Sequence, residues 1–152
     1  YLLISIFLFL IFHLGFLKNF KIFLGDSGSN FLGFLLSWII IFYTIPINSF
    51  IHPVLAIWTI TYPLFDFLSV IIKRLLMHRS PFQADMNHFH HYLLKTTKSK
   101  FYTLLILFVI SIALNLIGIL IFHILGPIAA FFGFFLLFLL FFFATRYLVY
   151  RF

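Results

Sequence analysis

Long apolar runs separated by short polar segments make up almost the whole chain. Each run is about long enough to cross a hydrocarbon core of roughly 30 Å as an α-helix. Lipid offers the backbone no hydrogen-bond partners, which favours helices because they satisfy their own amide groups. The pattern therefore predicts an all-α, polytopic membrane protein in which residues 1–152 form a single transmembrane domain. The five predicted transmembrane helices lie at about 1–17, 31–47, 53–72, 101–122 and 128–145.

The composition agrees with this class of protein. Hydrophobic residues make up 64% of the chain and charged residues only 9%, far from the balance of a soluble domain. The absence of cysteine excludes disulfides and thiol chemistry. Tyr1 lies inside an apolar run that no charged segment precedes, which is not the pattern of a signal peptide. We therefore expect the chain to be the C-terminal portion of a larger multi-span protein.

The basic residues orient the chain in the membrane. They collect in 18–30, 73–100 and 146–152, and the positive-inside rule makes these segments and the C-terminus cytoplasmic. A net charge of +7 in such segments fits anionic headgroups and anionic substrates. Nucleic acid is not an expected partner, because the basic residues form no continuous stripe. The chain's three carboxylates fall in or near the cytoplasmic half, where we expect the chemistry: Asp26, Asp66 and Asp85.

The first cytoplasmic connection contains a glycine-rich polar motif, GDSGSN, at 25–30. Gly25 and Gly28 allow a tight turn and a close approach to a ligand. The unpaired amide hydrogens at the start of the next helix attract anions, and polar side chains there could bind a substrate. The alternative is a simple helix cap followed by turn glycines. The candidates for the site at this helix N-terminus are Asp26, Ser29 and Asn30.

Asp66 lies within an apolar run, about two turns before Lys73. A carboxylate inside a membrane span is costly and by default indicates function. The alternative is a structural ion pair, or a hydrogen bond to a neighbouring helix. Pro63 is expected to kink the helix just ahead of this residue.

The segment 79–91, RSPFQADMNHFHH, is a polar island between apolar runs. Pro81 favours a turn, and Asp85 could then N-cap a short helix that ends near Lys95. In such a helix, His88 and His91 would share one face.

Three kinds of site are compatible with the histidines His88, His90 and His91. With Asp85 they could supply the ligands of a zinc site. They could instead bind anions or transfer protons, with Mg²⁺ held elsewhere by oxygen ligands, which this hard ion prefers. The third reading is a solvated loop.

Together, the segments 23–34 (FLGDSGSNFLGF) and 79–91 resemble the two C-terminal signatures of the polyprenyl-phosphate N-acetylhexosamine-1-phosphate transferases of glycosyltransferase family 4. The resemblance covers roughly 16–95. The Ser-Pro-Phe and His-x-His-His pattern is similar to the WecA/TagO branch. The MraY branch, whose members transfer phospho-MurNAc-pentapeptide, ranks second because a different sequence leads into its histidines.

The resemblance implies an enzyme of the bacterial inner membrane. Such an enzyme transfers a sugar-1-phosphate, with GlcNAc-1-phosphate as the default, from a UDP-sugar to polyprenyl (undecaprenyl) phosphate and releases UMP. The reaction serves the synthesis of lipopolysaccharide or another envelope polysaccharide. Mg²⁺ is the implied cofactor, with Mn²⁺ as its substitute, and a homodimer is a compatible assembly.

The resemblance also implies roles for single residues. Asp26 matches the metal-binding aspartate, and the three histidines match a motif implicated in binding the nucleotide sugar or its phosphates. Arg79 fits a diphosphate contact, since a guanidinium can bind phosphate with two hydrogen bonds. Asp85 would orient a histidine or hold the loop.

The chain departs from the family in lacking an adjacent aspartate pair and an Asn-rich segment, which lie upstream in complete members. We therefore expect this stretch alone to be inactive. Two other classes remain open, a non-catalytic membrane fragment and a histidine-rich metal transporter. A transporter would carry polar residues along several spans, whereas the last two spans contain little beyond Ser111 and Asn115.

Overall fold

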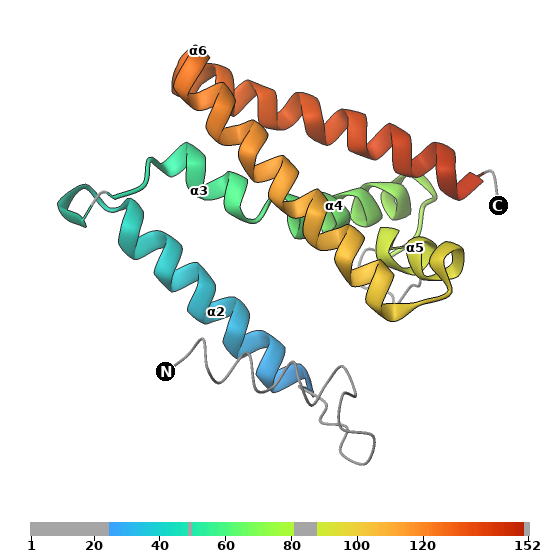
Figure 1. Ribbon diagram of the computed structural model, residues 1–152. Helices are drawn as coiled ribbons and strands as arrows, with labels where there is room; N and C mark the ends of the chain where they lie inside the picture. The colour runs from blue at the N-terminus through green and yellow to red at the C-terminus, as the bar shows by residue number, and fades with distance from the viewer. Residues whose placement is uncertain (1–24, 49, 81–87, 151–152) are drawn as a thin grey trace. The chain divides into compact units, whose positions relative to one another are not determined.

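The computed structural model describes residues 25–48, 50–80 and 88–150, which contain helices and their connections and no strand. This confirms the predicted all-α class (Figure 1). The chain divides into two compact units, Tyr1–Asn48 and Ser49–Phe152. The helices are α2 (Gly25–Thr44), the 3₁₀-helix η1 (Pro46–Asn48), α3 (Pro53–Thr59), α4 (Thr61–Leu76), α5 (Phe89–Thr97) and α6 (Lys100–Tyr150).

Among the described residues, two helices, α2 and α6, are long and apolar enough to cross a membrane. The number rises to three if the bent pair of α3 and α4 forms one span. The presence of apolar helices that could span a membrane therefore agrees with the prediction, whereas the predicted number of five spans is not confirmed. The first predicted span, 1–17, lies outside the described residues.

Helix α2 begins earlier than the apolar pattern predicted. Gly25 has a positive φ of 67°, and the polar residues that follow it already form helical turns. The predicted turn at Gly28 is therefore wrong, because this glycine lies inside the helix. Ser29 Oγ donates a hydrogen bond of 3.0 Å to the backbone oxygen of Asp26, which holds the first turn together. None of the side chains of α2 is buried, as expected of a helix that faces lipid.

The third predicted span is bent. Helices α3 and α4 meet at Ile60 with an angle of 73° between them. Pro63 lies in the first turn of α4, where its missing amide hydrogen costs no helical hydrogen bond. A kink at Pro63, just ahead of Asp66, was predicted; the bend is present, but it lies at Ile60, before the proline. At the other end of α4, His78 adopts a positive φ of 54°, and the Arg79 amide donates to the Arg74 carbonyl at 2.9 Å.

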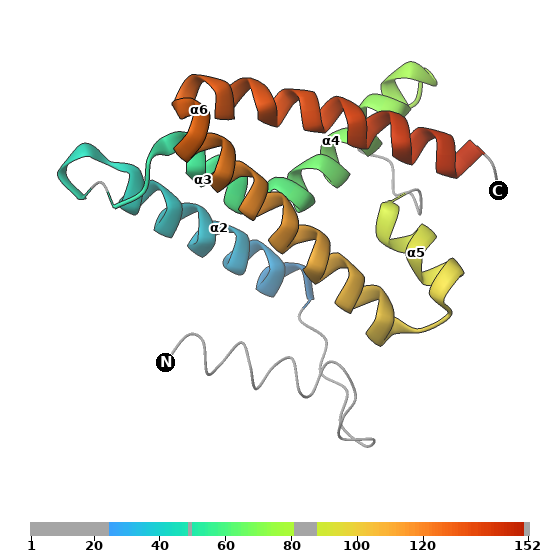
Figure 2. The same ribbon diagram turned by 45° about the horizontal axis from the view of Figure 1, so that its top comes forward.

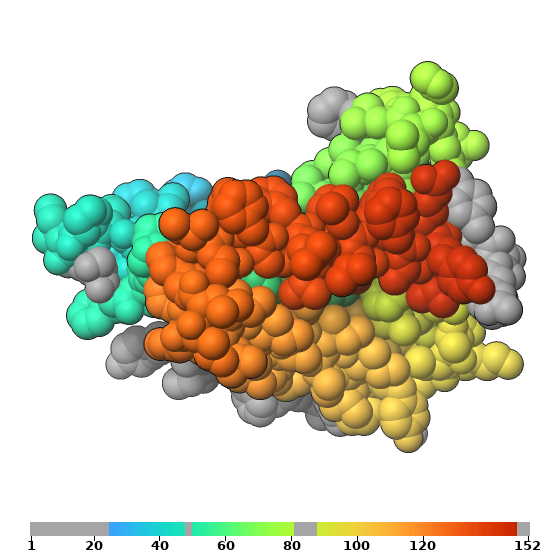
Figure 3. All heavy atoms as spheres, turned by 90° about the horizontal axis from the view of Figure 1, so that it is seen from above, coloured from blue at the N-terminus to red at the C-terminus, as the bar shows by residue number. Residues whose placement is uncertain are grey.

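Helix α6 consists of two arms that reverse direction at Gly126 (Figure 1). Gly126 has φ 87° and ψ 177°, which are not helical values, and Pro127 follows it. This break lies between the predicted spans 101–122 and 128–145. Helices α3, α4 and α5 all contact α6 (Figure 2). The second arm, red in Figure 3, covers one face of this unit, and the end of α4 projects beside it.

Aromatic rings fill the core between α3, α4 and the second arm of α6. Trp58, Phe65 and Phe134 are buried together, and the ring centroids of the two phenylalanines lie 4.9 Å apart. Trp58 Nε1 donates to the Ala130 carbonyl at 3.2 Å, so the indole has a hydrogen-bond partner in its buried position. On the first arm, Gly118 leaves room for the Trp58 ring, because a Cβ at this position would overlap it.

Replacing Gly118 with Ala should therefore destabilise the protein by about 1–3 kcal/mol, the usual cost of overpacking a core. Gly33→Ala is the matched control, since Gly33 lies within α2 and a Cβ there meets nothing within 4 Å. Removing that helical glycine should stabilise the protein by up to about 1 kcal/mol. Denaturant unfolding of the purified protein in detergent measures both changes. Equal stability of the two variants would contradict the packing of Trp58 on α6.

Candidate functional site

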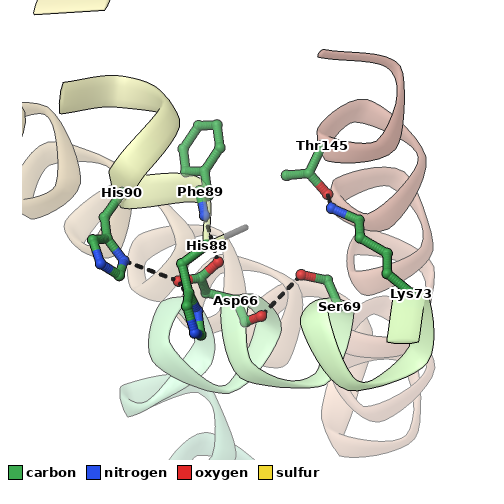
Figure 4. Close-up of polar contacts among 7 residues, drawn as sticks. All are labelled: Asp66, Ser69, Lys73, His88, Phe89, His90 and Thr145. Atoms are coloured by element: carbon green, nitrogen blue, oxygen red, sulfur yellow. Dashed lines mark hydrogen bonds and ion pairs between the residues drawn. The ribbon is translucent and has the colours of Figure 1, made fainter. Parts of the chain in front are cut away.

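The carboxylate of Asp66 joins α4 to the start of α5 (Figure 4). Its Oδ1 accepts the backbone amide hydrogen of Phe89 at 2.9 Å. Its Oδ2 lies 3.2 Å from Nδ1 of His88 and 3.4 Å from Nδ1 of His90. Asp66 is only 6% exposed, so these groups take the place of water around the carboxylate. A buried carboxylate of this kind is stable only when it is hydrogen-bonded.

The position of Asp66 suits the helix it contacts. The first amide hydrogens of a helix lack intrahelical partners, and its N-terminus carries partial positive charge. His88 is the N-cap residue of α5, and its side chain makes no capping hydrogen bond. Asp66 therefore caps α5 from a different helix. Asp85, predicted as the N-cap of a helix near 85–95, lies outside the described residues, and α5 begins at Phe89.

The three histidine rings form a cluster at this helix end. The rings of His88 and His90 are stacked with centroids 5.3 Å apart, and the ring centroids of His90 and His91 lie 4.2 Å apart. His88 precedes the helix, so the prediction that it shares a helical face with His91 is wrong in detail, although their centroids are 6.4 Å apart. The side chains of His88 and His90 remain 28% and 43% exposed. The cluster is thus held on one side and open on the other.

The donor set of this cluster favours some metals over others. One oxygen of Asp66 and one nitrogen each of His88 and His90 lie within 4.8 Å of one another. Two imidazoles do not fit Mg²⁺, which prefers oxygen ligands, and are typical of Zn²⁺ and related ions. If a zinc ion bound here, its carboxylate ligand among the described residues would be Asp66. Hydrogen bonds from the imidazoles to the carboxylate account for the same distances.

Lys73 extends the polar strip along α4 but turns towards α6. Its Nζ donates to Thr145 Oγ1 at 3.1 Å, and Thr145 is buried in the second arm of α6. Ser69 Oγ donates to the backbone oxygen of Asp66 at 2.9 Å, which leaves the carboxylate to α5. Of the two structural alternatives for Asp66, the structure contains the hydrogen bond to a neighbouring helix. Since its partners are the candidate histidines, this bond also bears on function.

The other described candidates belong to the start of α2 and the end of α4. Asp26, Ser29 and Asn30 are exposed on the first turns of α2, in the unit Tyr1–Asn48. Arg79 is exposed just after the end of α4. The structure thus brings together His88, His90 and His91, and it adds Asp66, a partner that the sequence motif did not assign. The available signal was the isolated carboxylate in an apolar helix, 22 residues before the first of these histidines.

Comparison with known proteins finds several relatives that share one name. The chain is 34% identical over 144 residues to an undecaprenyl-phosphate alpha-N-acetylglucosaminyl 1-phosphate transferase of Haemophilus influenzae. This match covers 92% of the chain and 40% of the relative. Proteins of the same name from Pasteurella multocida and Escherichia coli K12 are 38% identical over 82% of the chain and 37% identical over 51% of it. These matches cover 35% and 21% of the two relatives.

The chain thus spans about two fifths of the length of the first of these relatives. No family model matches the chain. No solved structure matches it either.

Proposed function

We propose that the chain, which is similar to undecaprenyl-phosphate alpha-N-acetylglucosaminyl 1-phosphate transferases, provides part of the active site of such an enzyme. The enzyme would transfer GlcNAc-1-phosphate from UDP-GlcNAc to undecaprenyl phosphate at the cytoplasmic face of the bacterial inner membrane. An oxygen of the lipid phosphate would attack the phosphorus next to the sugar, and the bond to UMP would break. The observation that carries this proposal is sequence similarity over 92% of the chain.

The shape of α6 supports a topology in which each of its arms crosses the membrane. A straight helix of its 51 residues would be about 75 Å long at 1.5 Å per residue, more than twice a hydrocarbon core of about 30 Å. The break at Gly126 divides this length into two. With the bent pair of α3 and α4 as one further span, 73–100 and the C-terminus lie on the same side. By the positive-inside rule, the basic residues of these segments support a cytoplasmic location for that side.

Asp26 is the residue we assign to the metal. An exposed carboxylate in a first helical turn offers oxygen ligands and leaves room for substrate phosphates, the combination that Mg²⁺ uses in phosphoryl transfer. Bound Mg²⁺, or Mn²⁺ in its place, would neutralise phosphate charge during the displacement. Ser29 and Asn30, on the same exposed turns, would contact the substrate.

The histidine cluster would receive the nucleotide sugar. The open edges of His88 and His90, with His91 beside them, can donate to phosphate oxygens or accept from sugar hydroxyl groups. Arg79 is exposed and can engage the diphosphate with two parallel hydrogen bonds. Asp85 would hold the loop that leads into the histidines. The lipid substrate requires the membrane, and a homodimer is compatible with the site.

UMP release by membranes that contain the full-length gene product tests this proposal. We expect release only when UDP-GlcNAc, undecaprenyl phosphate and Mg²⁺ are all present, and little with UDP-MurNAc-pentapeptide. Membranes without the protein provide the background. A preference for UDP-MurNAc-pentapeptide would assign the protein to the MraY type, and no release with any donor would indicate a non-catalytic protein.

A further inference from the structure

The contacts of Asp66 suggest a function beyond joining two helices. We propose that Asp66 is a positioning residue that holds His88 and His90 in the tautomer with hydrogen on Nδ1, so that both present Nε2 to the substrate. The expected effect on catalysis rests on the proposed transferase function. The tautomers themselves can be measured without any activity.

The tautomer follows from the chemistry of the carboxylate. An ionised carboxylate has only acceptor oxygens, so a nitrogen that is hydrogen-bonded to it must carry the hydrogen. Nδ1 of His88 and Nδ1 of His90 lie 3.2 Å and 3.4 Å from the same Oδ2. A neutral imidazole that donates through Nδ1 has its free electron pair on Nε2.

The contact of Asp66 Oδ1 fixes the direction in which Oδ2 points. Oδ1 accepts the Phe89 amide hydrogen at 2.9 Å, which ties the carboxylate plane to the start of α5. Phe89 lies directly between the two histidines in sequence, so the backbone contact and the imidazole contacts hold the same short segment (Figure 4). Because the Asp66 side chain is only 9% exposed, water competes little for either oxygen.

The imidazoles themselves are not enclosed. With 28% and 43% of their side chains exposed, His88 and His90 can touch a ligand while Nδ1 contacts Asp66. In a neutral imidazole, Nε2 could accept the hydrogen of a sugar hydroxyl group. In a protonated imidazole, Nε2 could donate a hydrogen bond to a phosphate oxygen. A carboxylate behind an imidazole is a known means of setting its tautomer and orientation in catalysis.

A metal ion at the same three atoms would require the opposite tautomer. Coordination through Nδ1 uses the electron pair of that nitrogen, so the hydrogen would move to Nε2. The tautomer therefore separates the positioning role of Asp66 from a zinc site made of Asp66, His88 and His90.

Solid-state NMR of the full-length protein in bilayers, with ¹⁵N-labelled histidine, tests the proposal. Signals of His88 and His90 are assigned from single His→Asn variants. We expect both rings to carry hydrogen on Nδ1 in the wild type, with or without added Zn²⁺. A neutral ring with hydrogen on Nε2 and none on Nδ1, in either histidine, would overturn the proposal, and a shift to that tautomer on adding Zn²⁺ would favour the metal site. This arm gives a result even if the protein has no transferase activity.

The activity arm uses Asp66→Asn, which keeps the shape and one acceptor oxygen for the Phe89 amide. Its amide group would face the imidazoles as a donor, so at least one ring should change tautomer. We expect kcat/KM to fall about 10–100-fold, the range found when the hydrogen-bond partner of a metal-bound imidazole is replaced. Ser69→Ala is the matched control, because Ser69 bonds only the backbone oxygen of Asp66, and it should leave kcat/KM unchanged. A folded Asp66→Asn protein with altered tautomers and wild-type kcat/KM would overturn the proposal.

Discussion

Replacing Asp26 with Asn is expected to lower UMP release at least about 100-fold, which corresponds to about 2.7 kcal/mol of transition-state stabilisation at 1.36 kcal/mol per tenfold change. The amide cannot offer Mg²⁺ the charge of a carboxylate. The fold should tolerate the change, because the Asp26 side chain is exposed and Ser29 bonds its backbone oxygen. Initial rates of UMP release, with a melting curve for each protein, measure both effects.

A cysteine at the same position tests whether Asp26 is a metal ligand. Residues 1–152 contain no cysteine, so Asp26→Cys adds a thiol to this part of the protein at one defined position. A thiolate binds softer ions better than Mg²⁺. We expect the variant to be inactive with Mg²⁺ and to recover part of its activity with Mn²⁺ or Cd²⁺, whereas Asp26→Asn recovers none. Activity of Asp26→Asn close to wild type would exclude the metal role.

Replacing His90 with Ala is expected to lower kcat/KM for UDP-GlcNAc at least about 30-fold. Its imidazole is the more exposed of the two that contact Asp66, and it lies at the centre of the histidine cluster. An imidazole that transfers a proton or binds charge in the transition state contributes about 10²–10⁴-fold where it acts directly. Steady-state kinetics at saturating undecaprenyl phosphate provide the measurement.

His123→Gln is the control for this loss. His123 is also exposed but lies near the break between the arms of α6, which the proposed topology would put at the opposite membrane face. Its replacement should leave kcat/KM unchanged. If the two variants lose activity equally, the effect belongs to histidine content or expression and the site assignment of His90 fails.

The fold was predictable where single residues dictate the backbone. Gly126 followed by Pro127 breaks α6 between the predicted spans 101–122 and 128–145, since glycine accepts a positive φ and proline cannot continue the preceding helix. Pro63 likewise predicted the bend between α3 and α4. The predicted start of α2 was wrong because the prediction began the helix at the first apolar residues, near 31, whereas the helix begins at Gly25. Polar residues and Gly28 are tolerated in the first turns of a helix, where a carboxylate such as Asp26 is favourable.

The candidate site was predictable only in part. The histidines were found from their spacing, but the group that contacts His88 and His90 comes from α4, 22 residues before His88 in the sequence. The local sequence pattern therefore predicted a helix cap within the segment, at Asp85, whereas Asp66 accepts the hydrogen bond from the Phe89 amide. Such a contact depends on how α4 and α5 pack on α6.

The central claim is that a sugar and the phosphate next to it move together to the lipid. UDP-GlcNAc that carries ³²P in the phosphate attached to the sugar tests it most directly, with membranes that contain the full-length protein. We predict that the label moves to an undecaprenyl-diphosphate-GlcNAc lipid and that the UMP released is unlabelled. Label recovered in UDP, with an unlabelled glycolipid, would show transfer of the sugar alone and would contradict the account.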